Sequence, residues 1–301
     1  MVASWKFDRS PSTIAFHPDG RRIAAKVFPG LMEFDLGLEA ITLELPTQRH
    51  DGTLLTPGAA YSPDGVLIAV GSGSLIEIFA AATGYSVASL DRMGQVCYRS
   101  MAFSPDSSLL AAGTMMPGRI TVWDIKAATV AFKPFPIFDT IDGVGFSPDG
   151  KVLVCSGMSR QLAMAMVRTS DWEMIGIIPG SHWFGRIRIP ASGDLIAATG
   201  QPRLRVYDWE TLQELWQTEE SSPFALDVTA DGKWIATSRN GRDVVILSAR
   251  TGEVMREWIA YEHNRVDRMH ALAFSPDGSK LASANSEGVL KVWALGAESV
   301  E

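Results

Sequence analysis

The chain has 301 residues, of which 46% are hydrophobic and 20% are charged, and its formal net charge is −7. This length allows one large all-β domain or two ordinary domains, and the composition is typical of a protein with a substantial core. The negative charge argues against nucleic-acid binding, which usually needs a basic face. No apolar run is long enough to span a membrane, so we expect no membrane contact.

The N-terminal residues and the cysteines indicate the compartment. Residues 1–10 alternate apolar and charged side chains and lack the apolar core and cleavage site of a secretory signal. The chain has two cysteines, Cys97 and Cys155, and both lie in apolar runs, which predicts buried, reduced thiols. We therefore expect a cytoplasmic protein.

The first predicted element is a strand at residues 3–8, and it precedes a turn sequence that recurs along the chain. Five clear copies of this turn occupy residues 16–20, 61–65, 103–107, 146–150 and 274–278, and two worn copies occupy 189–193 and 228–232. The last residues of successive copies are 45, 42, 43, 43, 39 and 46 residues apart. This period is typical of the four-stranded blades of a β-propeller, so the sequence predicts seven blades.

Each repeat follows the same order of strands. An apolar strand ends at a Pro-Asp-Gly turn, where proline fixes φ and glycine supplies the positive φ of a tight hairpin. The second strand is rich in small apolar residues, as at 22–26, 67–70, 109–112, 195–198, 234–237 and 281–283, and is expected between neighbouring blades. The third strand alternates apolar and polar residues at 120–124, 204–208 and 290–293, which predicts a half-buried strand. A fourth strand closes most repeats, for example at 85–90 and 253–258.

These features resemble the WD-repeat family over essentially the whole chain. The Phe-Ser-Pro-Asp-Gly turn and the strand ending Val122-Trp123-Asp124 are marks of that family. The resemblance implies one all-β domain over residues 1–301, a seven-bladed propeller of four-stranded antiparallel blades. It also implies a scaffold for protein binding rather than an enzyme.

The sequence departs from the family pattern in two ways. It contains no Gly-His dipeptide, and one blade carries the literal Trp-Asp pair. The family's buried Asp-His-Ser-Trp network is therefore expected to be absent from most blades. The last blade is expected to keep a remnant, formed by Ser283, Trp293 and either His263 or His270. Trp123 and Trp293 are expected to be buried.

The last repeat has three strands after Met269, and the strand at residues 3–8 has no blade of its own. Members of the WD-repeat family close their ring by lending the N-terminal strand to the last blade. This sequence is arranged in the same way. Closure removes an exposed sheet edge, which would otherwise invite aggregation.

The resemblance sorts the loops into two faces. The Pro-Asp-Gly turns lie on one face, and their aspartates are expected to stabilise their own turns. The other face, called here the top face, carries the loops between second and third strands and the connections between blades. Its arginines and exposed aromatic residues are typical of interaction hot spots. We expect a protein or peptide partner, preferably an acidic one, to bind there through Trp183, Phe184, Arg186, Arg239, Arg242 and Arg268.

Two aromatic segments could each either pack within the fold or bind a partner. Trp183 and Phe184 lie in a connection bounded by glycine, where they either plug the central channel or anchor a partner. Residues 132–138 carry three phenylalanines and two prolines, and they either pack on the rim of their blade or form a docking ridge.

The alternative function is an enzyme, or a binder of a small ligand or metal, that uses the central channel. The sequence has no phosphate-binding loop, nucleophile elbow or metal-ligand spacing. We therefore expect no catalytic residue, no cofactor and no metal, although His50, His182, His263 and His270 map to the top face. His17 stands where the turn usually has serine and is expected to be a surface turn residue. The oligomeric state is not predicted.

Overall fold

The computed structural model describes residues 1–28, 30–46, 58–72, 75–90, 98–132, 138–159, 162–179, 184–200, 203–219, 225–262 and 268–296, with the backbone alone for Ser72, Leu162 and Phe184. Over these residues the chain forms 28 β-strands and no helix, so the expected all-β fold is confirmed. No helix in this part of the chain is long and apolar enough to cross a membrane.

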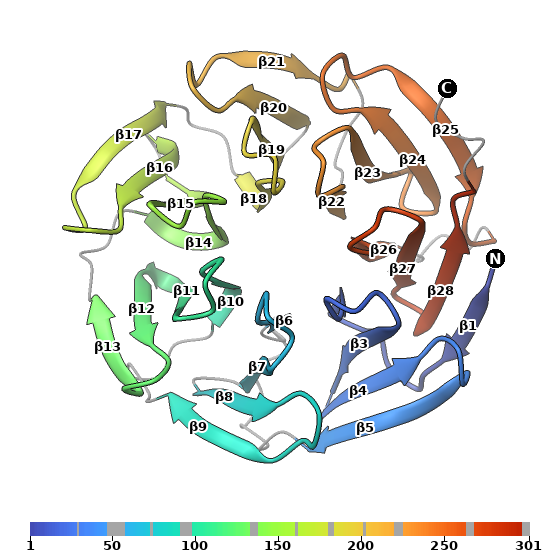
Figure 1. Ribbon diagram of the computed structural model, residues 1–301. Helices are drawn as coiled ribbons and strands as arrows, with labels where there is room; N and C mark the ends of the chain where they lie inside the picture. The colour runs from blue at the N-terminus through green and yellow to red at the C-terminus, as the bar shows by residue number, and fades with distance from the viewer. Residues whose placement is uncertain are drawn as a thin grey trace. The chain divides into compact units, whose positions relative to one another are not determined.

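The four strands of each repeat form consecutive antiparallel neighbours (Figure 1). The first two sets are β2 (Thr13–Phe16), β3 (Arg22–Val27), β4 (Gly30–Asp35) and β5 (Ala40–Pro46), then β6 (Ala59–Tyr61), β7 (Leu67–Ser72), β8 (Leu75–Ala80) and β9 (Ser86–Leu90). The next two are β10 (Tyr98–Phe103), β11 (Leu109–Gly118), β12 (Ile120–Asp124) and β13 (Thr129–Phe132), then β14 (Phe138–Phe146), β15 (Val152–Met158), β16 (Leu162–Arg168) and β17 (Met174–Pro179).

The remaining strands complete the pattern. They are β18 (Phe184–Arg188), β19 (Leu195–Gly200), β20 (Leu204–Asp208) and β21 (Glu214–Gln217), then β22 (Leu226–Val228), β23 (Trp234–Arg239), β24 (Asp243–Ser248) and β25 (Val254–Ile259). The last set is β26 (Met269–Phe274), β27 (Lys280–Asn285) and β28 (Val289–Ala294), completed by β1 (Ala3–Lys6).

Two of these sets are joined into one eight-stranded sheet. Strand β11 continues past its own sheet and pairs with β14, with Met115 opposite Thr140 and Gly118 opposite Phe138. A Cβ atom on Gly118 would lie 2.5 Å from the Phe138 carbonyl oxygen. Glycine is therefore required at this close approach of two backbones.

The chain separates into two compact units, one formed by Met1–Glu44 with Arg188–Glu301 and the other by Leu45–Ile187. Within each unit, the hydrophobic clusters draw residues from two sheets. In the first unit, Ile14 and Phe16 of β2 pack with Ala273 of β26. In the second unit, Ile78 of β8 packs with Leu110 of β11. Each sheet therefore buries its apolar surface against a neighbour.

The second strands are buried on both faces, as predicted, and the third strands are more buried than predicted. Thr121, on the polar side of β12, is 2% exposed because sheets pack against both faces of its strand. Trp123 on the same strand is 1% exposed, as expected. Trp293 is only half-buried, and its ring meets that of Trp258 edge to face at 5.7 Å.

The N-terminal strand β1 pairs with β28, as the sequence predicted. The antiparallel register places Trp5 opposite Leu290, and Phe7 N donates a hydrogen bond to Gly288 O at 2.8 Å. The Trp5 ring also lies 4.8 Å from the Phe34 ring of β4. Strand β1 therefore contacts both the last sheet and the first sheet of the repeat series.

The last sheet keeps part of the expected hydrogen-bond network, with one partner changed. Trp293 Nε1 donates to Ser283 Oγ at 3.2 Å, and Ser283 Oγ lies 2.8 Å from the hydroxyl of Tyr261. The third member is thus Tyr261 and not His270, while His263 lies outside the described residues. A tyrosine hydroxyl both donates and accepts, so it replaces a histidine nitrogen in this position.

The equivalent network is missing beside Trp123. Register places Trp123 opposite Leu110 just as it places Trp293 opposite Leu281, so Ala112 occupies the place of Ser283. The buried Trp123 Nε1 has no acceptor among the described residues. We predict that Ala112→Ser supplies that acceptor and raises the free energy of unfolding by about 1 kcal/mol, measured by chemical denaturation.

A matched control for this prediction is Ala111→Ser. Ala111 is equally buried but belongs to the hydrophobic cluster on the other face of β11. Its new hydroxyl would replace apolar contacts and lower the stability. Equal destabilisation by both substitutions would contradict the proposed equivalence of Ala112 and Ser283.

Removal of residues 1–9 is predicted to lower the melting temperature sharply. The truncation exposes the edge of β28 and uncovers Phe34, which packs against Trp5 and Phe7. Circular dichroism during a thermal melt measures the change. Trp5→Ala, which keeps the backbone pairing, should lower the melting temperature by less. An unchanged melt after truncation would show that β1 contributes nothing to the stability of the last sheet.

Candidate binding face

A tight turn brings three of the arginines predicted from the sequence close together in the chain's first unit. Arg239 and Arg242 flank the β23–β24 turn, whose central residues Asn240 and Gly241 have positive φ of 53° and 73°. Two consecutive positive φ angles are what a two-residue hairpin requires, and Asn-Gly is the preferred sequence for it. The turn is closed by a 3.2 Å hydrogen bond from Arg242 N to Arg239 O.

The third arginine, Arg268, is joined to this turn through the backbone. Met269 N donates to Gly241 O at 2.6 Å, which fixes the start of β26 against the β23–β24 turn. Arg268 is itself held by Ser286, whose Oγ accepts from Arg268 N at 2.9 Å. Arg239, Arg242 and Arg268 are called the arginine cluster below.

Two members of the arginine cluster form ion pairs that the sequence did not predict. Arg239 Nη1 lies 2.6 Å from Glu257 Oε2, and Arg242 Nε lies 3.0 Å from Asp243 Oδ1. The first pair is partly exposed, with side-chain exposures of 28% and 37%, so it contributes little stability. Asp243 is buried and holds the Arg242 guanidinium in place.

The structure describes less of the other predicted site residues. Trp183 lies outside the described residues, as do His50 and His182, and only the backbone of Phe184 is described, at the start of β18. Arg186 is a half-buried residue of the same strand. Whether Trp183 and Phe184 plug a channel or anchor a partner therefore stays open.

The segment at 132–138 is described at its two ends, and both ends pack. The rings of Phe132 and Trp172 are stacked at 4.7 Å with an interplanar angle of 6°. Phe138 is buried at the start of β14. The packing interpretation is confirmed for these two residues, while residues 133–137 lie outside the described part.

The turn aspartates bind their own turns, as predicted. In each turn an aspartate Oδ1 accepts from the backbone nitrogen two residues later, at 2.8–3.1 Å, for Asp19, Asp64, Asp106, Asp149, Asp231 and Asp277. Five of them also accept from a serine or threonine hydroxyl, contributed by Ser62, Ser104, Ser147, Thr229 and Ser275. These carboxylates are structural. In the sheet of β22–β25, Asp231 lies in the β22–β23 turn, at the opposite end from the β23–β24 turn of the arginine cluster.

Stability is predicted to fall in acid because of these turns. The hydrogen bond from Ser275 and the further bonds from Ser279 lower the pKa of Asp277 from 3.8 to about 2. A lowered folded-state pKa means that the stabilisation is complete above about pH 4 and is lost as the pH falls towards 2. Asp277→Asn should therefore melt below the wild type at pH 7, and the gap should close by pH 2. A gap that is constant across this range would contradict the assignment.

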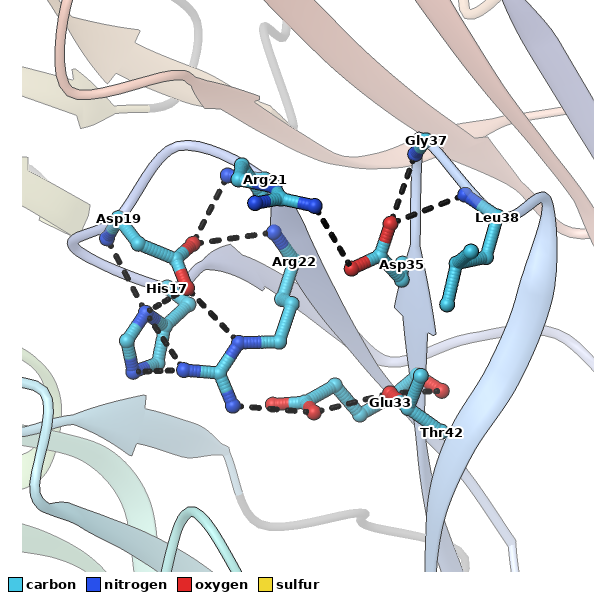
Figure 2. Close-up of polar contacts among 9 residues, drawn as sticks. All are labelled: His17, Asp19, Arg21, Arg22, Glu33, Asp35, Gly37, Leu38 and Thr42. Carbon is cyan, nitrogen blue, oxygen red and sulfur yellow. Dashed lines mark hydrogen bonds and ion pairs between the residues drawn. The ribbon is translucent and has the colours of Figure 1, made fainter.

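His17 was predicted to be a surface turn residue, and this is wrong. It is 6% exposed, and its Nδ1 lies 3.0 Å from Asp19 Oδ2 (Figure 2). Arg22 lies across both groups, with Nη2 at 2.8 Å from His17 Nε2 and Nε at 2.8 Å from Asp19 Oδ2. Arg22 Nη1 also reaches the buried Glu33, at 3.4 Å from Oε1. His17 therefore takes over the turn-binding role of the usual serine.

This network at the first turn has the residue types of a catalytic site but is committed to structure. Thr42 Oγ1 donates to Glu33 Oε1 at 3.0 Å, and Asp19 N donates to His17 Nδ1 at 3.0 Å (Figure 2). Burial raises the pKa of Asp19, but hydrogen bonds from Arg21 and Arg22 lower it by more than burial raises it, and the resulting pKa is about 2. His17, Asp19, Arg22 and Glu33 thus make their described polar contacts within the network.

Other chemistry was sought in the described residues. No group of three or more histidine, cysteine, aspartate or glutamate side chains there could hold a metal ion. Cys155 is a free thiol with no exposed surface, as predicted, and burial raises its pKa to about 12. A thiol in that environment is not a nucleophile. Cys97 lies outside the described residues.

Comparison with known protein families identifies the repeats. Residues 87–124 and 259–294 match the family described as WD domain, G-beta repeat. The two matches end at β12 and β28, the strands that carry Trp123 and Trp293. The two matched repeats are WD repeats, and relatives named as WD repeat-containing proteins support the same family for the chain. Its remaining repeats have the same strand order, with the same turn or a worn copy of it.

Three relatives illustrate the range of similar proteins, and two of them are named as WD repeat-containing proteins. The target of rapamycin complex subunit wat1 of Schizosaccharomyces pombe is 28% identical over 118 residues, 38% of this chain. WD repeat-containing protein 1 of Gallus gallus is 23% identical over 206 residues, 66% of this chain. WD repeat-containing protein SL1-17 of Schistosoma mansoni is 30% identical over 124 residues, 40% of this chain. The alignments span 36%, 33% and 40% of the relatives' own lengths.

Proposed function

We propose that this WD-repeat protein is a cytoplasmic scaffold that binds a protein or peptide partner, preferably an acidic one, on its top face. The observation that carries the proposal is the arginine cluster, in which the Met269–Gly241 hydrogen bond joins arginines from two neighbouring sheets. Guanidinium groups bind carboxylates through two parallel hydrogen bonds, and arginine is common at interaction hot spots. Trp183, Phe184 and Arg186 are the remaining candidate contacts.

The proposed scaffold is a ring of seven blades that is closed by β1. Support comes from the five four-stranded sheets and from the eight-stranded sheet, which contains two further sets of four strands. The pairing of β1 with β28 gives the last set its fourth strand. A rigid frame of this kind suits a binding scaffold, because side chains on its loops are positioned before the partner arrives.

The family also supports a binding role. WD-repeat proteins generally act as scaffolds for protein interactions and are generally not catalytic. One of the relatives is named as a subunit of a complex. The proposal for this chain is of the same general kind, with an acidic partner that the positive charge of the arginine cluster attracts.

Partner binding is predicted to depend on a few large side chains. The partner would be captured from the native host by affinity pull-down, and its dissociation constant then measured with purified variants. Trp183→Ala should weaken binding by about 2 kcal/mol, roughly 30-fold, without a change in melting temperature. A loss of stability without a specific loss of affinity would favour the plug interpretation of Trp183.

The arginine cluster is tested by removing charge without reversing it. The triple variant Arg239→Gln, Arg242→Gln and Arg268→Gln should slow association and flatten its dependence on salt. Charge reversal is avoided because a glutamate at 239 or 242 would face Glu257 or Asp243. Arg250→Gln is the matched control, since Arg250 follows β24 at the other end of the same sheet. Binding that survives the triple variant but fails in the control would move the site to the opposite face.

A further inference from the structure

Every second residue of the N-terminal segment, from Trp5 to Arg9, contacts an aromatic ring of the first sheet. The ring centroids of Trp5 and Phe7 lie 4.8 Å and 5.6 Å from that of Phe34 on β4. The guanidinium carbon of Arg9 lies 5.0 Å from the centroid of the Phe28 ring. Trp5 and Phe7 serve packing, because these half-buried rings cover the buried Phe34. Arg9 instead brings a positive charge to the end of β3.

The Arg9–Phe28 pair lies at the surface. Phe28 directly follows β3 and is 38% exposed, and Arg9 is exposed as well. A cation over the face of an aromatic ring is attracted by the ring quadrupole, so Phe28 restrains the Arg9 guanidinium without neutralising it. Within the described residues Arg9 forms no ion pair with a carboxylate, in contrast to Arg239 and Arg242. In this part of the chain, its charge is positioned by a ring rather than by an anion.

Hydrogen bonds connect this pair to the arginine cluster within the chain's first unit. Ser10, which follows Arg9, donates from Oγ to Asn285 O at 3.0 Å. The next residue, Ser286, donates from its backbone nitrogen to Arg268 O at 2.9 Å. Arg268 belongs to the arginine cluster. The pair and the cluster thus lie along one row of contacts over the ends of three sheets.

The connections that carry Arg9 and Arg268 are built alike. Each leads into the first strand of a repeat, and each is hydrogen-bonded to a neighbouring sheet near the end of that sheet's second strand. Met269 binds the turn after β23, and Ser10 binds Asn285 at the end of β27. In both connections an arginine directly precedes the residue that makes this bond. Arg9 therefore occupies, one sheet farther on, the place that Arg268 occupies in the arginine cluster.

We infer that the Arg9–Phe28 pair is a carboxylate-binding site of the same face, and that the partner binds as an extended acidic segment. A guanidinium has its N–H donors in one plane, so it binds a carboxylate through two parallel hydrogen bonds while an aromatic ring supports it. Alternate side chains of an extended segment point the same way, so such a segment presents carboxylates to successive arginines along the row. The acidic partner rests on the proposed function, while the site itself rests on the contacts of Arg9.

Phe28 contributes to this site in two ways. Its ring keeps the long Arg9 side chain in one place, which lowers the entropy lost when a carboxylate binds. Its exposed area also offers an apolar contact to the methylene groups of a glutamate side chain. Aromatic residues and arginine are the residue types that interaction hot spots favour. The N-terminal segment therefore both completes the last sheet and delivers a binding residue to the face.

The inference is tested by NMR of the arginine side chains with an acetylated hexaglutamate peptide as the probe. The Nε–Hε resonance of Arg9 should shift and saturate as the peptide is added, and a hexaserine peptide should leave it in place. Arg21 is the internal control, because it precedes β3 at the opposite end of the first sheet and its side chain is 72% exposed. An Arg9 resonance that moves no more than that of Arg21 would overturn the inference.

Two variants separate the charge of the site from its aromatic support. Arg9→Gln should weaken binding of the hexaglutamate peptide about fivefold, because a charged hydrogen-bonded pair is lost. Phe28→Leu keeps the charge and should weaken binding about twofold, with folding checked by the melting temperature. Arg21→Gln removes the same charge at the other end of the sheet and should leave the affinity unchanged. Equal losses in Arg9→Gln and Arg21→Gln would reject a specific site at Arg9.

The triple variant of the arginine cluster separates this inference from the proposed function. Loss of peptide binding in the triple variant, with none in Arg9→Gln, supports the cluster and rejects the Arg9 site. Loss in Arg9→Gln, with none in the triple variant, supports the Arg9 site and rejects the cluster. Losses in both variants, with full binding in Arg21→Gln, support one extended acidic segment along the whole row.

Discussion

The structure depends on one constraint, which is that a four-stranded sheet of this sequence is apolar on both faces. Strand β27 shows the consequence, because Ala282 packs with residues of the first sheet while the adjacent Leu281 packs with residues of the sheet of β22–β25. No such sheet buries its surface alone, so each repeat is stable only in the company of its neighbours. Strand β1 meets the same demand at the end of the series, where it covers the edge of β28.

The sequence predicted those features that have a local physical cause. Proline, aspartate and glycine fix the turn whatever surrounds it, so the positions of the second and third strands followed from the recurrence of that turn. Strand β12 and strand β20 occupy the predicted residues, 120–124 and 204–208. The binding of the turn aspartates to their own backbone also followed from local chemistry.

Features that depend on partners distant in the sequence were missed. The replacement of histidine by Tyr261 needs the distance to Ser283, 22 residues away, and no motif encodes it. The ion pair of Arg239 with Glu257 arises because β24 lies between β23 and β25 and brings their ends together. His17 was misjudged because a turn pattern alone does not show its contact with Arg22, which is itself paired with the buried Glu33.

On the candidate face, the guanidinium groups of Arg239 and Arg242 are already paired with carboxylates. An unpaired guanidinium attracts any anion, whereas one already paired with a carboxylate exchanges it only for a ligand of better geometry. The pair of Arg239 with Glu257 is more exposed than the pair of Arg242 with Asp243, so the two arginines of one short turn differ in how readily they exchange their carboxylate for a ligand. If the proposed partner binds there, this arrangement would favour a ligand that matches both arginines.

The pairing of the two chain ends has a consequence for the time that folding takes. Ala3 finds its partner at Val292, almost at the other end of the chain. At a synthesis rate of about 5–20 residues per second, β1 waits roughly 15–60 s on the ribosome before β28 exists. Trp5 of β1, and Phe7 just after the strand, lack their final environment throughout that interval. A chaperone that holds the nascent β1 segment would therefore act on it longer than on strands that pair with their neighbours in the chain.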